Sequence, residues 1–290
     1  MSAIQESERT AIQEELVRFL RAEAGEDTLR RGMQSDLGYD RAVWQKMAEM
    51  GLLGIAISED FGGIGGSAID TAMVAEALGR SLLPLPYIET CVIAPALLEA
   101  SDMSDESRKI LTRIAQGTAT IAIGGNADIV PFRDPDCRFA IKADGTMSGE
   151  VSLVMHGASA DFLLLALYSG NQTRCLLVSS DHDYTIENQT ANDPALRPAK
   201  VSLANVPFIE LTGWRNDDLE QARWQGIVAL SAQQTGAARA IFEVTVDYLQ
   251  TRYQFGRPIG SFQALKHIAA DLFLEVESAT SAAQAAAKAL

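Results

Sequence analysis

Apolar residues recur at helical spacing through the first part of the chain. Ile12, Leu16, Phe19 and Leu20 lie three or four residues apart or adjacent, as on the buried face of an amphipathic helix. The Leu-Pro-Leu-Pro run at residues 83–86 interrupts this pattern, because the residue before a proline is sterically disfavoured in the helical conformation. The pattern predicts an N-terminal all-helical domain over residues 1–117.

Between residues 118 and 213 the apolar residues alternate or form short runs, which is typical of strands. An Asp144-Gly145 pair separates two of these runs and favours a hairpin turn, and residues 169–173 indicate a second turn. No G-x-G-x-x-G sequence follows a predicted strand, so the usual dinucleotide-binding fingerprint is missing. These features predict a middle domain that is an antiparallel β-barrel or sandwich. The predicted strands cover residues 138–143, 150–155, 162–167, 175–178 and 200–203.

Helical spacing returns in residues 214–290. Ala237, Ile241, Val244 and Tyr248 form one apolar face, and the helix is predicted to break at residues 255–258. A second helix is predicted to begin after Ser261, a suitable N-cap residue. We expect a C-terminal helical bundle, incomplete because its alanine-rich end carries an apolar stripe but no stop signal. The expected fold class is therefore mixed α and β, with a helical, a β and a helical domain in that order.

The composition limits the classes of function. The chain has 290 residues, of which 47% are hydrophobic, and a formal net charge of −14. Nucleic acids and anionic membranes are bound chiefly by clustered Lys and Arg, so neither is an expected partner. The three cysteines form no close pair, the first residues do not resemble a secretory signal, and no apolar run approaches the roughly 20 residues that cross a bilayer. We expect no metal site and a cytoplasmic location.

The candidate chemistry lies in residues 248–267, YLQTRYQFGRPIGSFQALKH. Arg252 falls at the predicted end of a helix, and its planar guanidinium can bind two phosphate oxygens at once. Phe255 and Gly256 allow the chain to turn closely around a flat ligand. Gln263 falls in the first turn of the next predicted helix, where its amide and the free backbone N–H groups can bind an anion. A diphosphate best matches this set of groups.

This stretch resembles the C-terminal-domain signature of acyl-CoA dehydrogenases. Residues 50–63 (MGLLGIAISEDFGG), 76–79 (EALG) and 84–86 (PLP) resemble the N-terminal helical domain of the same family. The resemblance implies an FAD-dependent oxidoreductase that converts an acyl-CoA thioester to the trans-2-enoyl-CoA, in fatty acid or steroid side-chain β-oxidation. It also implies that Arg252, Phe255 and Gln263 contact FAD held by a neighbouring subunit of a homo- or heterotetramer. An electron-transfer flavoprotein is the implied electron acceptor.

Two flavin-binding motifs of the family are altered in the middle domain. The family's Thr-Glu-Pro-Gly-x-Gly-Ser-Asp motif corresponds to residues 122–128 (AIGGNAD), and its Trp-Ile-Thr-Asn-Gly motif corresponds to residues 153–157 (LVMHG). The stacking aromatic and the hydroxyl donor are therefore missing, and we expect only the backbone of Met155 to hydrogen-bond the edge of the flavin ring. His156 and His267 are interpreted as structural histidines with satisfied hydrogen bonds.

The sequence identifies no catalytic base, although removal of the α proton needs a carboxylate. Most family members place this glutamate in a late helix that would follow Leu290. A minority place it on the helix before the arginine motif, where this chain has Gly226; Glu220 is out of register. Three interpretations stay open: a trimmed form of a complete dehydrogenase, a degenerate subunit whose partner supplies the flavin bed and the glutamate, and a flavin-free scaffold or binding protein with the same fold.

Overall fold

The N-terminal part of the chain is a group of helices around one apolar core. The computed structural model describes residues 4–169, 172–193 and 195–290. Leu16, Trp44 and Met47 are almost completely buried in this core, which confirms the predicted helical fold of this part. Its elements are α1 (Glu6–Glu23), α2 (Glu26–Gln34), α3 (Arg41–Glu49), the 3-10 turns η1 (Leu52–Gly54) and η2 (Glu59–Phe61), α4 (Ala68–Ser81), the π-helix η3 (Ile88–Ile93), α5 (Ala94–Ala100) and α6 (Asp105–Ala115).

Local sequence sets the limits of α4. Ser67 and Asp70 form a capping box at its start, in which each side chain accepts a hydrogen bond from the other residue's backbone N–H. The helix ends just before the proline-containing run, with Leu82 in the left-handed conformation at φ 52°. The chain then enters the wide turns of η3, which the spacing of apolar residues did not predict.

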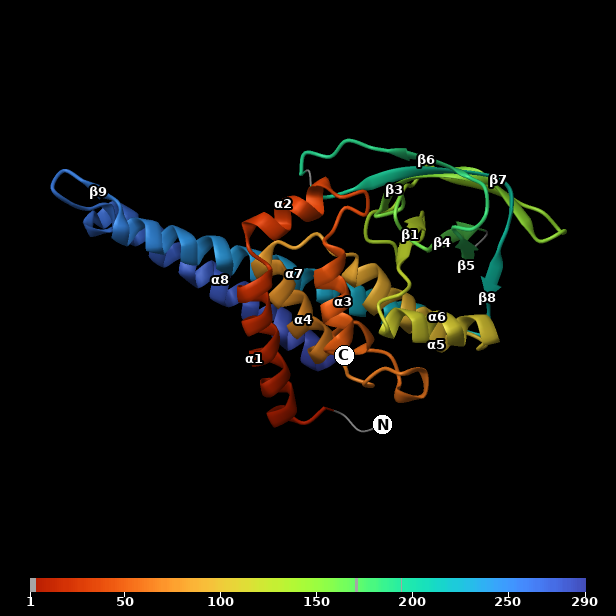
Figure 1. The fold of residues 1–290 in the computed structure, drawn as a ribbon, viewed down its shortest axis with the longest axis horizontal. Coiled ribbons are helices and arrows are strands. Elements are labelled where there is room, and N and C mark those ends of the chain that lie inside the picture. Colours follow the sequence, from red (N-terminus) through yellow and green to blue (C-terminus); the bar gives the residue numbers. More distant parts are fainter. Residues whose placement is uncertain (1–3, 170–171, 194) are drawn as a thin grey trace.

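The middle of the chain forms two four-stranded sheets that pack face to face (Figure 1). One sheet has the order β1-β4-β5-β8 and the other β2-β3-β7-β6. Neighbouring strands are antiparallel, as predicted, except that β1 and β4 run parallel. This exception arises because the chain forms the β2–β3 hairpin of the other sheet between β1 and β4. The strands are β1 (Ile121–Gly125), β2 (Arg138–Ile141), β3 (Thr146–Met155), β4 (Phe162–Ser169), β5 (Gln172–Ser179), β6 (Thr185–Asn188), β7 (Pro198–Pro207) and β8 (Ile209–Leu211).

The predicted Asp144-Gly145 turn is confirmed between β2 and β3. The Gly145 N–H donates to the Lys142 carbonyl at 3.2 Å, and the Asp144 carboxylate accepts from the Thr146 N–H at 3.0 Å. β4 and β5 also pair antiparallel, with Ser169 opposite Gln172. Residues 170 and 171 of the second predicted turn lie outside the described residues.

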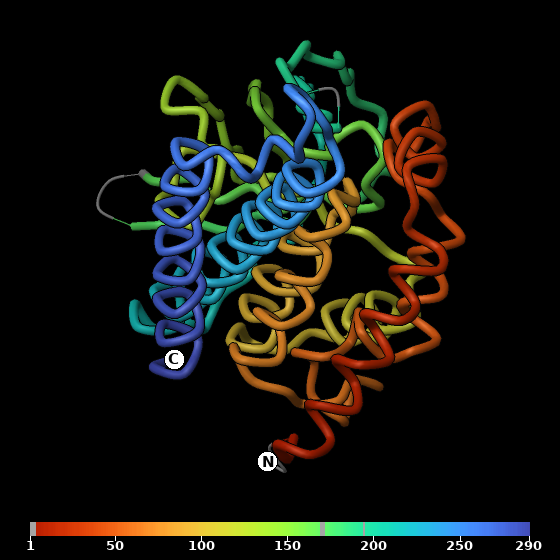
Figure 2. Tube along the Cα trace, turned by 90° about the vertical axis from the view of Figure 1, so that its left-hand side faces the viewer, coloured from red at the N-terminus to blue at the C-terminus, as the bar shows by residue number. Residues whose placement is uncertain are grey.

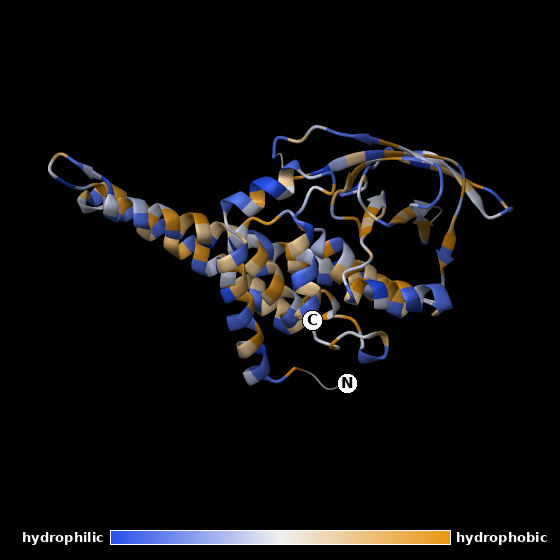
Figure 3. Ribbon diagram, viewed as in Figure 1, coloured by the Kyte–Doolittle hydropathy of each residue, from blue (hydrophilic) through white to orange (hydrophobic). Residues whose placement is uncertain are grey.

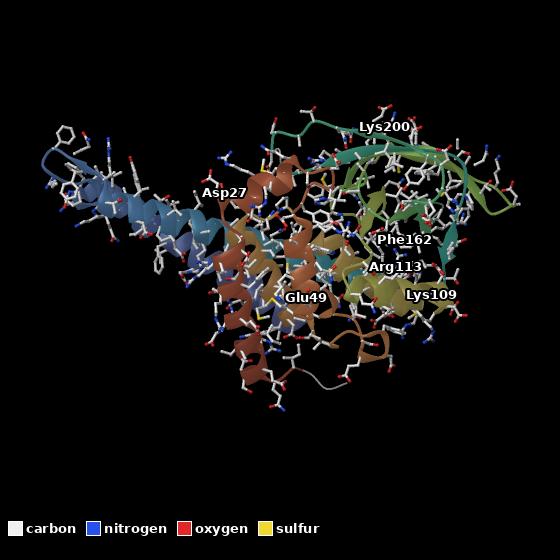
Figure 4. All side chains as sticks on the ribbon, viewed as in Figure 1. Asp27, Glu49, Lys109, Arg113, Phe162 and Lys200 are labelled. Atoms are coloured by element: carbon white, nitrogen blue, oxygen red, sulfur yellow. The ribbon has the colours of Figure 1, made fainter. Side chains whose placement is uncertain are left out.

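The sheet that contains β4 has two buried faces. Leu163 and Leu165 pack into the core between the sheets, whereas Leu164 belongs to the core shared with the helices, as expected because successive strand residues point to opposite faces. Figure 4 shows Arg113 of α6 beside Phe162 of β4, with the guanidinium carbon 5.4 Å from the ring centre. The helical group and the sandwich therefore share a buried boundary.

Two long helices, α7 (Asn216–Thr251) and α8 (Gln263–Ala289), form a hairpin that projects from the body of the molecule (Figures 1 and 2). The connection between them contains β9 (Tyr253–Gln254), β10 (Arg257–Pro258) and the 3-10 turn η4 (Ile259–Ser261).

The prediction of Ser261 as the cap of the second helix is wrong. The Phe262 N–H donates to the Ile259 carbonyl at 3.1 Å, which holds Ser261 inside η4 and places Phe262 at the N-cap position.

Glycines bring α4 and α7 into backbone contact. A Cβ atom on Gly79 would lie 1.9 Å from the Gln233 carbonyl oxygen, and one on Gly236 would lie 2.1 Å from the Glu76 carbonyl oxygen. Because no side chain fits between the helices at these points, α7 is fixed against the N-terminal helices along its first half. In the described ranges, no helix is long and apolar enough to span a bilayer.

Candidate functional site

A cavity of about 350 Å³ lies where three parts of the fold meet. Its walls come from the loop after α4, from η3, from the loop after β1, from the end of β3, from residues 193 and 195–196 before β7, and from the middle of α7. No lysine or arginine is among its described lining residues, so the cavity offers no cation for a phosphate or a carboxylate. Its lining includes Leu83, Glu89, Met155, His156, Leu230 and Gln233; we call this space the α4–α7 cavity.

The wall formed by η3 is held in place on two sides. The Thr90 hydroxyl donates to the Ile121 carbonyl and accepts from the Ile121 N–H, both at 3.0 Å, which ties η3 to the start of β1. On the other side, Gly226 of α7 packs directly against Ile93. The widened π-helical turn therefore has one fixed position relative to both the sheet and α7.

Met155 and His156 form the wall at the end of β3. Met155 is buried and lies opposite Pro198 of β7. Because proline has no N–H, the Met155 carbonyl receives no ladder hydrogen bond from this partner. His156 adopts the left-handed conformation at φ 56°, and its N–H donates to the Arg197 carbonyl at 3.0 Å.

The interpretation of His156 as a satisfied structural histidine is wrong. Its side chain is buried, but among the described residues its Nδ1 atom has no hydrogen-bond partner. Burial, and to a smaller extent the nearby Arg197 charge, lower the pKa of His156 to about 4. The imidazole is therefore neutral at physiological pH. His267, by contrast, is exposed on α8.

Glu89 is a cavity residue that the sequence analysis missed. Its side chain is 9% exposed, and its only hydrogen-bonding neighbour among the described residues is its own backbone N–H. Burial raises the pKa of the Glu89 carboxyl above its ordinary range, because removal from water disfavours the charged form. A signal was present in the sequence, since Glu89 is the one charged residue within the apolar run of residues 87–98.

Arg252, Phe255 and Gln263 come together at the far end of the hairpin, which we call the hairpin tip (residues 252–263). Arg252 is the C-cap of α7; its N–H donates to the Tyr248 carbonyl at 2.9 Å and its carbonyl accepts from the Ile259 N–H at 2.8 Å. Phe255 is 90% exposed at φ 54°. Gln263 is the first residue of α8, so its backbone N–H has no partner within that helix. All three side chains are exposed.

The structure does not bring Met155 to the hairpin tip. Ala237 is the last α7 residue on the wall of the α4–α7 cavity, and it precedes Arg252 by 252 − 237 = 15 residues, which is about 22 Å of helix. Figure 1 shows β9, in the connection between α7 and α8, far from β3. Within one chain the predicted cofactor residues thus form two separate groups.

Large apolar side chains are exposed along the hairpin. Monomeric soluble proteins rarely expose extended apolar surface of this kind. Figure 3 shows apolar segments along both helices outside the body of the molecule. The exposed residues are Ile241, Val244 and Tyr248 on α7, Tyr253 and Phe255 at the hairpin tip, and Ile268, Leu272, Phe273 and Leu274 on α8.

The position that a minority of the family uses for the catalytic glutamate is a packing position here. Gly226 is buried, and a Cβ atom on it would lie 2.7 Å from Ile93 Cδ1. Glu220 lies near the start of α7 and lines a different hollow with Arg223 and Tyr168. Neither residue supplies a carboxylate to the α4–α7 cavity.

Comparison with known proteins assigns most of the chain to one family. Residues 6–118 match the family model for the acyl-CoA dehydrogenase N-terminal domain, and residues 220–290 match the model for the C-terminal domain. The chain is 33% identical over 274 residues to acyl-CoA dehydrogenase IpdE2 of Mycobacterium tuberculosis, which covers 94% of this chain and 73% of that protein.

Solved structures share the fold. The steroid ACAD Tcur3481-Tcur3483, in a G363A variant, superposes with a TM-score of 0.83 at 27% identity, over 97% of this chain and 77% of that chain. The ChsE4-ChsE5 complex of Mycobacterium tuberculosis has a TM-score of 0.82 at 22% identity, over 96% of this chain and 77% of that chain. The predicted fold class, with helical, β-sandwich and helical parts, is confirmed.

Proposed function

Because this chain belongs to the acyl-CoA dehydrogenase family, we propose that it takes part in the FAD-dependent conversion of an acyl-CoA thioester to the trans-2-enoyl-CoA. We further propose that it does so as a subunit of an oligomer, a homo- or heterotetramer, whose flavin lies between two chains. One observation carries the proposal. Met155 lies at the α4–α7 cavity, whereas Arg252, Phe255 and Gln263 lie at the hairpin tip, so the tip of one chain must approach the cavity of another to join the two groups.

The hairpin tip fits the diphosphate and adenosine half of FAD. The exposed guanidinium of Arg252 can form two parallel hydrogen bonds to phosphate oxygens. The free N–H groups at the start of α8 add further donors beside Gln263. Phe255 presents its ring to solvent and meets Phe262 edge to face, with ring centres 6.0 Å apart. An aromatic side chain held in this way offers a flat apolar surface to a ligand.

The exposed apolar side chains of the hairpin support an assembly. They continue along α7 and α8 up to the hairpin tip, so a chain that covers them also lies beside Arg252 and Phe255. Interfaces between subunits are typically apolar at their centre and polar at the rim. The same contact would therefore bury the apolar face and bring a second chain to the cofactor residues.

The chain's own contribution to the chemistry is binding and the exclusion of water. When bound, FAD would accept the β hydrogen of the substrate as a hydride. The α proton must pass to a carboxylate, and position 226 offers only a glycine. Glu89 lines the cavity, and burial raises the pKa of its carboxyl group.

The glycine at position 226, in place of a glutamate, supports a more specific role for this chain as the non-catalytic subunit of a heteromeric dehydrogenase. In this role the chain contributes its hairpin tip to a flavin whose catalytic glutamate belongs to a different subunit. The structure named for Tcur3481 and Tcur3483 together is a steroid ACAD, and we propose a bulky acyl group of that kind as the substrate. An electron-transfer flavoprotein is the proposed electron acceptor.

Flavin reduction tests the proposal. The chain is purified alone and after co-expression with a second acyl-CoA dehydrogenase chain from the same organism, and acyl-CoA is added without oxygen. We expect the co-expressed assembly to be yellow and to lose its flavin absorbance when acyl-CoA is added.

The outcomes distinguish the possible roles. Flavin reduction by the chain alone would contradict the non-catalytic role while keeping the proposed reaction. A protein that is colourless in both preparations and binds no added FAD would contradict the proposal and favour a flavin-free scaffold.

A further inference from the structure

Glu89 is placed as a ligand-binding group rather than as a packing residue. It lies on the wall of the α4–α7 cavity, is 9% exposed, and has no hydrogen-bond partner on any other described residue. A buried polar group without a partner destabilises a fold relative to an apolar residue of the same size. Apart from the backbone N–H of Glu89 itself, nothing in the described part of the chain compensates for this loss, which points to a partner supplied by a ligand.

The local backbone also favours a ligand-binding role. Glu89 belongs to η3, a π-helix, and π-helical turns occur frequently at functional sites. The hydrogen bonds of the adjacent Thr90 to Ile121 and the contact of Ile93 with Gly226 fix this turn on both sides. The backbone of Glu89 is therefore held at one place on the cavity wall before any ligand binds.

The surroundings of Glu89 select an uncharged partner. Burial disfavours the charged form of the Glu89 carboxyl group and raises its pKa. When protonated, the group can donate one hydrogen bond and accept others. His156 on the same cavity wall is neutral, and no lysine or arginine lines the cavity within the described residues. An anionic ligand group would lack a counter-charge on this lining, and its second acidic residue, Asp193, is exposed to solvent. A hydroxyl or a ketone would meet matching groups at Glu89.

We infer that Glu89 recognises a neutral oxygen function, a hydroxyl or a ketone, on the acyl group that enters the α4–α7 cavity. This inference rests on the proposed function, because it takes the cavity to be the acyl-binding space. It makes Glu89 a specificity-determining residue for oxygenated acyl groups. The apolar side chains of the lining, such as Leu83 and Leu230, would hold the carbon skeleton.

Binding of matched acyl-CoA pairs tests the inference. The probes are hexanoyl-, octanoyl- and decanoyl-CoA and the corresponding ω-hydroxyacyl-CoAs, and the readout is the dissociation constant for the flavin-loaded assembly, measured by titration calorimetry. For at least one chain length we expect the wild type to bind the hydroxylated probe about five- to tenfold more tightly than the parent, as one net hydrogen bond provides. An ω-aminoacyl-CoA of the same length should bind more weakly than the hydroxylated probe.

Three variants separate recognition from general effects. Glu89→Leu, similar in size and apolar, should fold and lose the preference for the hydroxyl group. Glu89→Gln should retain most of the preference, because an amide also donates and accepts hydrogen bonds. Glu76→Gln is the matched control, since Glu76 is another partly buried carboxyl with a raised pKa but lies outside this cavity. It should behave as the wild type.

Each contrary outcome has a distinct meaning. Equal preferences in the wild type and in Glu89→Leu would overturn the inference, as would tighter binding of the amino probe. Binding of the parent acyl-CoAs without any preference would overturn it while leaving the proposed function intact. If the assembly binds none of the acyl-CoAs, the proposed function itself fails, and the inference fails with it.

Discussion

Gly226 of α7 and Ile93 of η3 pack so closely that a Cβ atom at position 226 would lie 2.7 Å from Ile93 Cδ1. The position therefore lacks both a carboxylate and the space for one. We predict that Gly226→Glu will not create a catalytic base and will reduce the free energy of unfolding by on the order of 4 kcal/mol, through overpacking and a buried charge. Denaturant unfolding and flavin reduction by acyl-CoA measure the two effects.

A second variant separates the contact from the charge. Gly226→Ala should cost about 1–3 kcal/mol. Its cost should be smaller by roughly 1 kcal/mol in an Ile93→Ala background, since that substitution removes both the Cγ1 and the Cδ1 atoms that would clash. A stable Gly226→Glu protein that reduces its flavin with acyl-CoA would show that the packing argument is wrong.

The backbone contact between α4 and α7 should tolerate no side chain. In Gly79→Ala the new methyl group would meet the Gln233 carbonyl oxygen, which cannot move without displacing the helix. We predict a loss of roughly 2–4 kcal/mol in the free energy of unfolding. Gly25→Ala is the control, because nothing lies within 4 Å of a Cβ atom there, and its cost should stay below about 1 kcal/mol. Equal costs for the two variants would contradict the described helix contact.

His156 should make stability depend on pH. Its pKa is lowered from 6.5 to about 4 in the folded chain, so between these values the unfolded chain binds a proton that the folded chain does not. The free energy of unfolding should therefore fall as the pH is lowered through this window, by about 2 kcal/mol between about pH 7.5 and about pH 5. Urea unfolding at the two pH values measures the change.

The matched variant for this prediction is His156→Asn. Asparagine tolerates the left-handed backbone at this position but does not titrate. Between about pH 7.5 and about pH 5, the free energy of unfolding of His156→Asn should fall by about 2 kcal/mol less than that of the wild type. The two proteins share all other titrating groups, so only the contribution of His156 differs. Identical pH profiles for the two proteins would show that His156 is not buried in its neutral form.

Assembly should depend on the exposed apolar face of the hairpin. Val244 is 62% exposed on α7, so Val244→Glu should change the free energy of unfolding by less than about 0.5 kcal/mol. In an oligomer that buries this face, the same substitution would place an unpaired charge in the interface and should shift the assembly to smaller species. Light scattering coupled to size-exclusion chromatography measures the shift, and an unchanged mass would place the interface elsewhere.

The sequence predicted the elements whose side-chain pattern is periodic. Leu16 and Leu20 of α1 are buried, as their spacing indicated, and the β2–β3 hairpin forms at Asp144 and Gly145. The parallel pairing of β1 with β4 could not be predicted in the same way, because it depends on contacts between strands about forty residues apart. The misassigned cap at Ser261 has a similar cause, since the β9–β10 pairing and η4 occupy the residues in which the helix was expected to begin.

The candidate site could be predicted only in part. The motif around Arg252 is continuous in sequence, so its residues could be recognised together. Glu89 and His156 are brought to one cavity by η3, β3 and α7, and no local pattern links them. Whether the buried Nδ1 of His156 has a hydrogen-bond partner likewise depends on residues distant in the chain, so the sequence alone could not show that it lacks one.

The FAD content per chain, measured on the co-expressed assembly, decides whether the hairpin tip binds flavin. In Arg252→Gln the guanidinium is lost from an exposed position, so we expect an assembly of unchanged mass and stability. Its FAD content per chain should be lower than that of the wild type by a factor of about ten or more. Arg18→Gln, at an exposed position on α1, should retain as much FAD as the wild type. An Arg252→Gln assembly with the full wild-type content of FAD would contradict the shared flavin site.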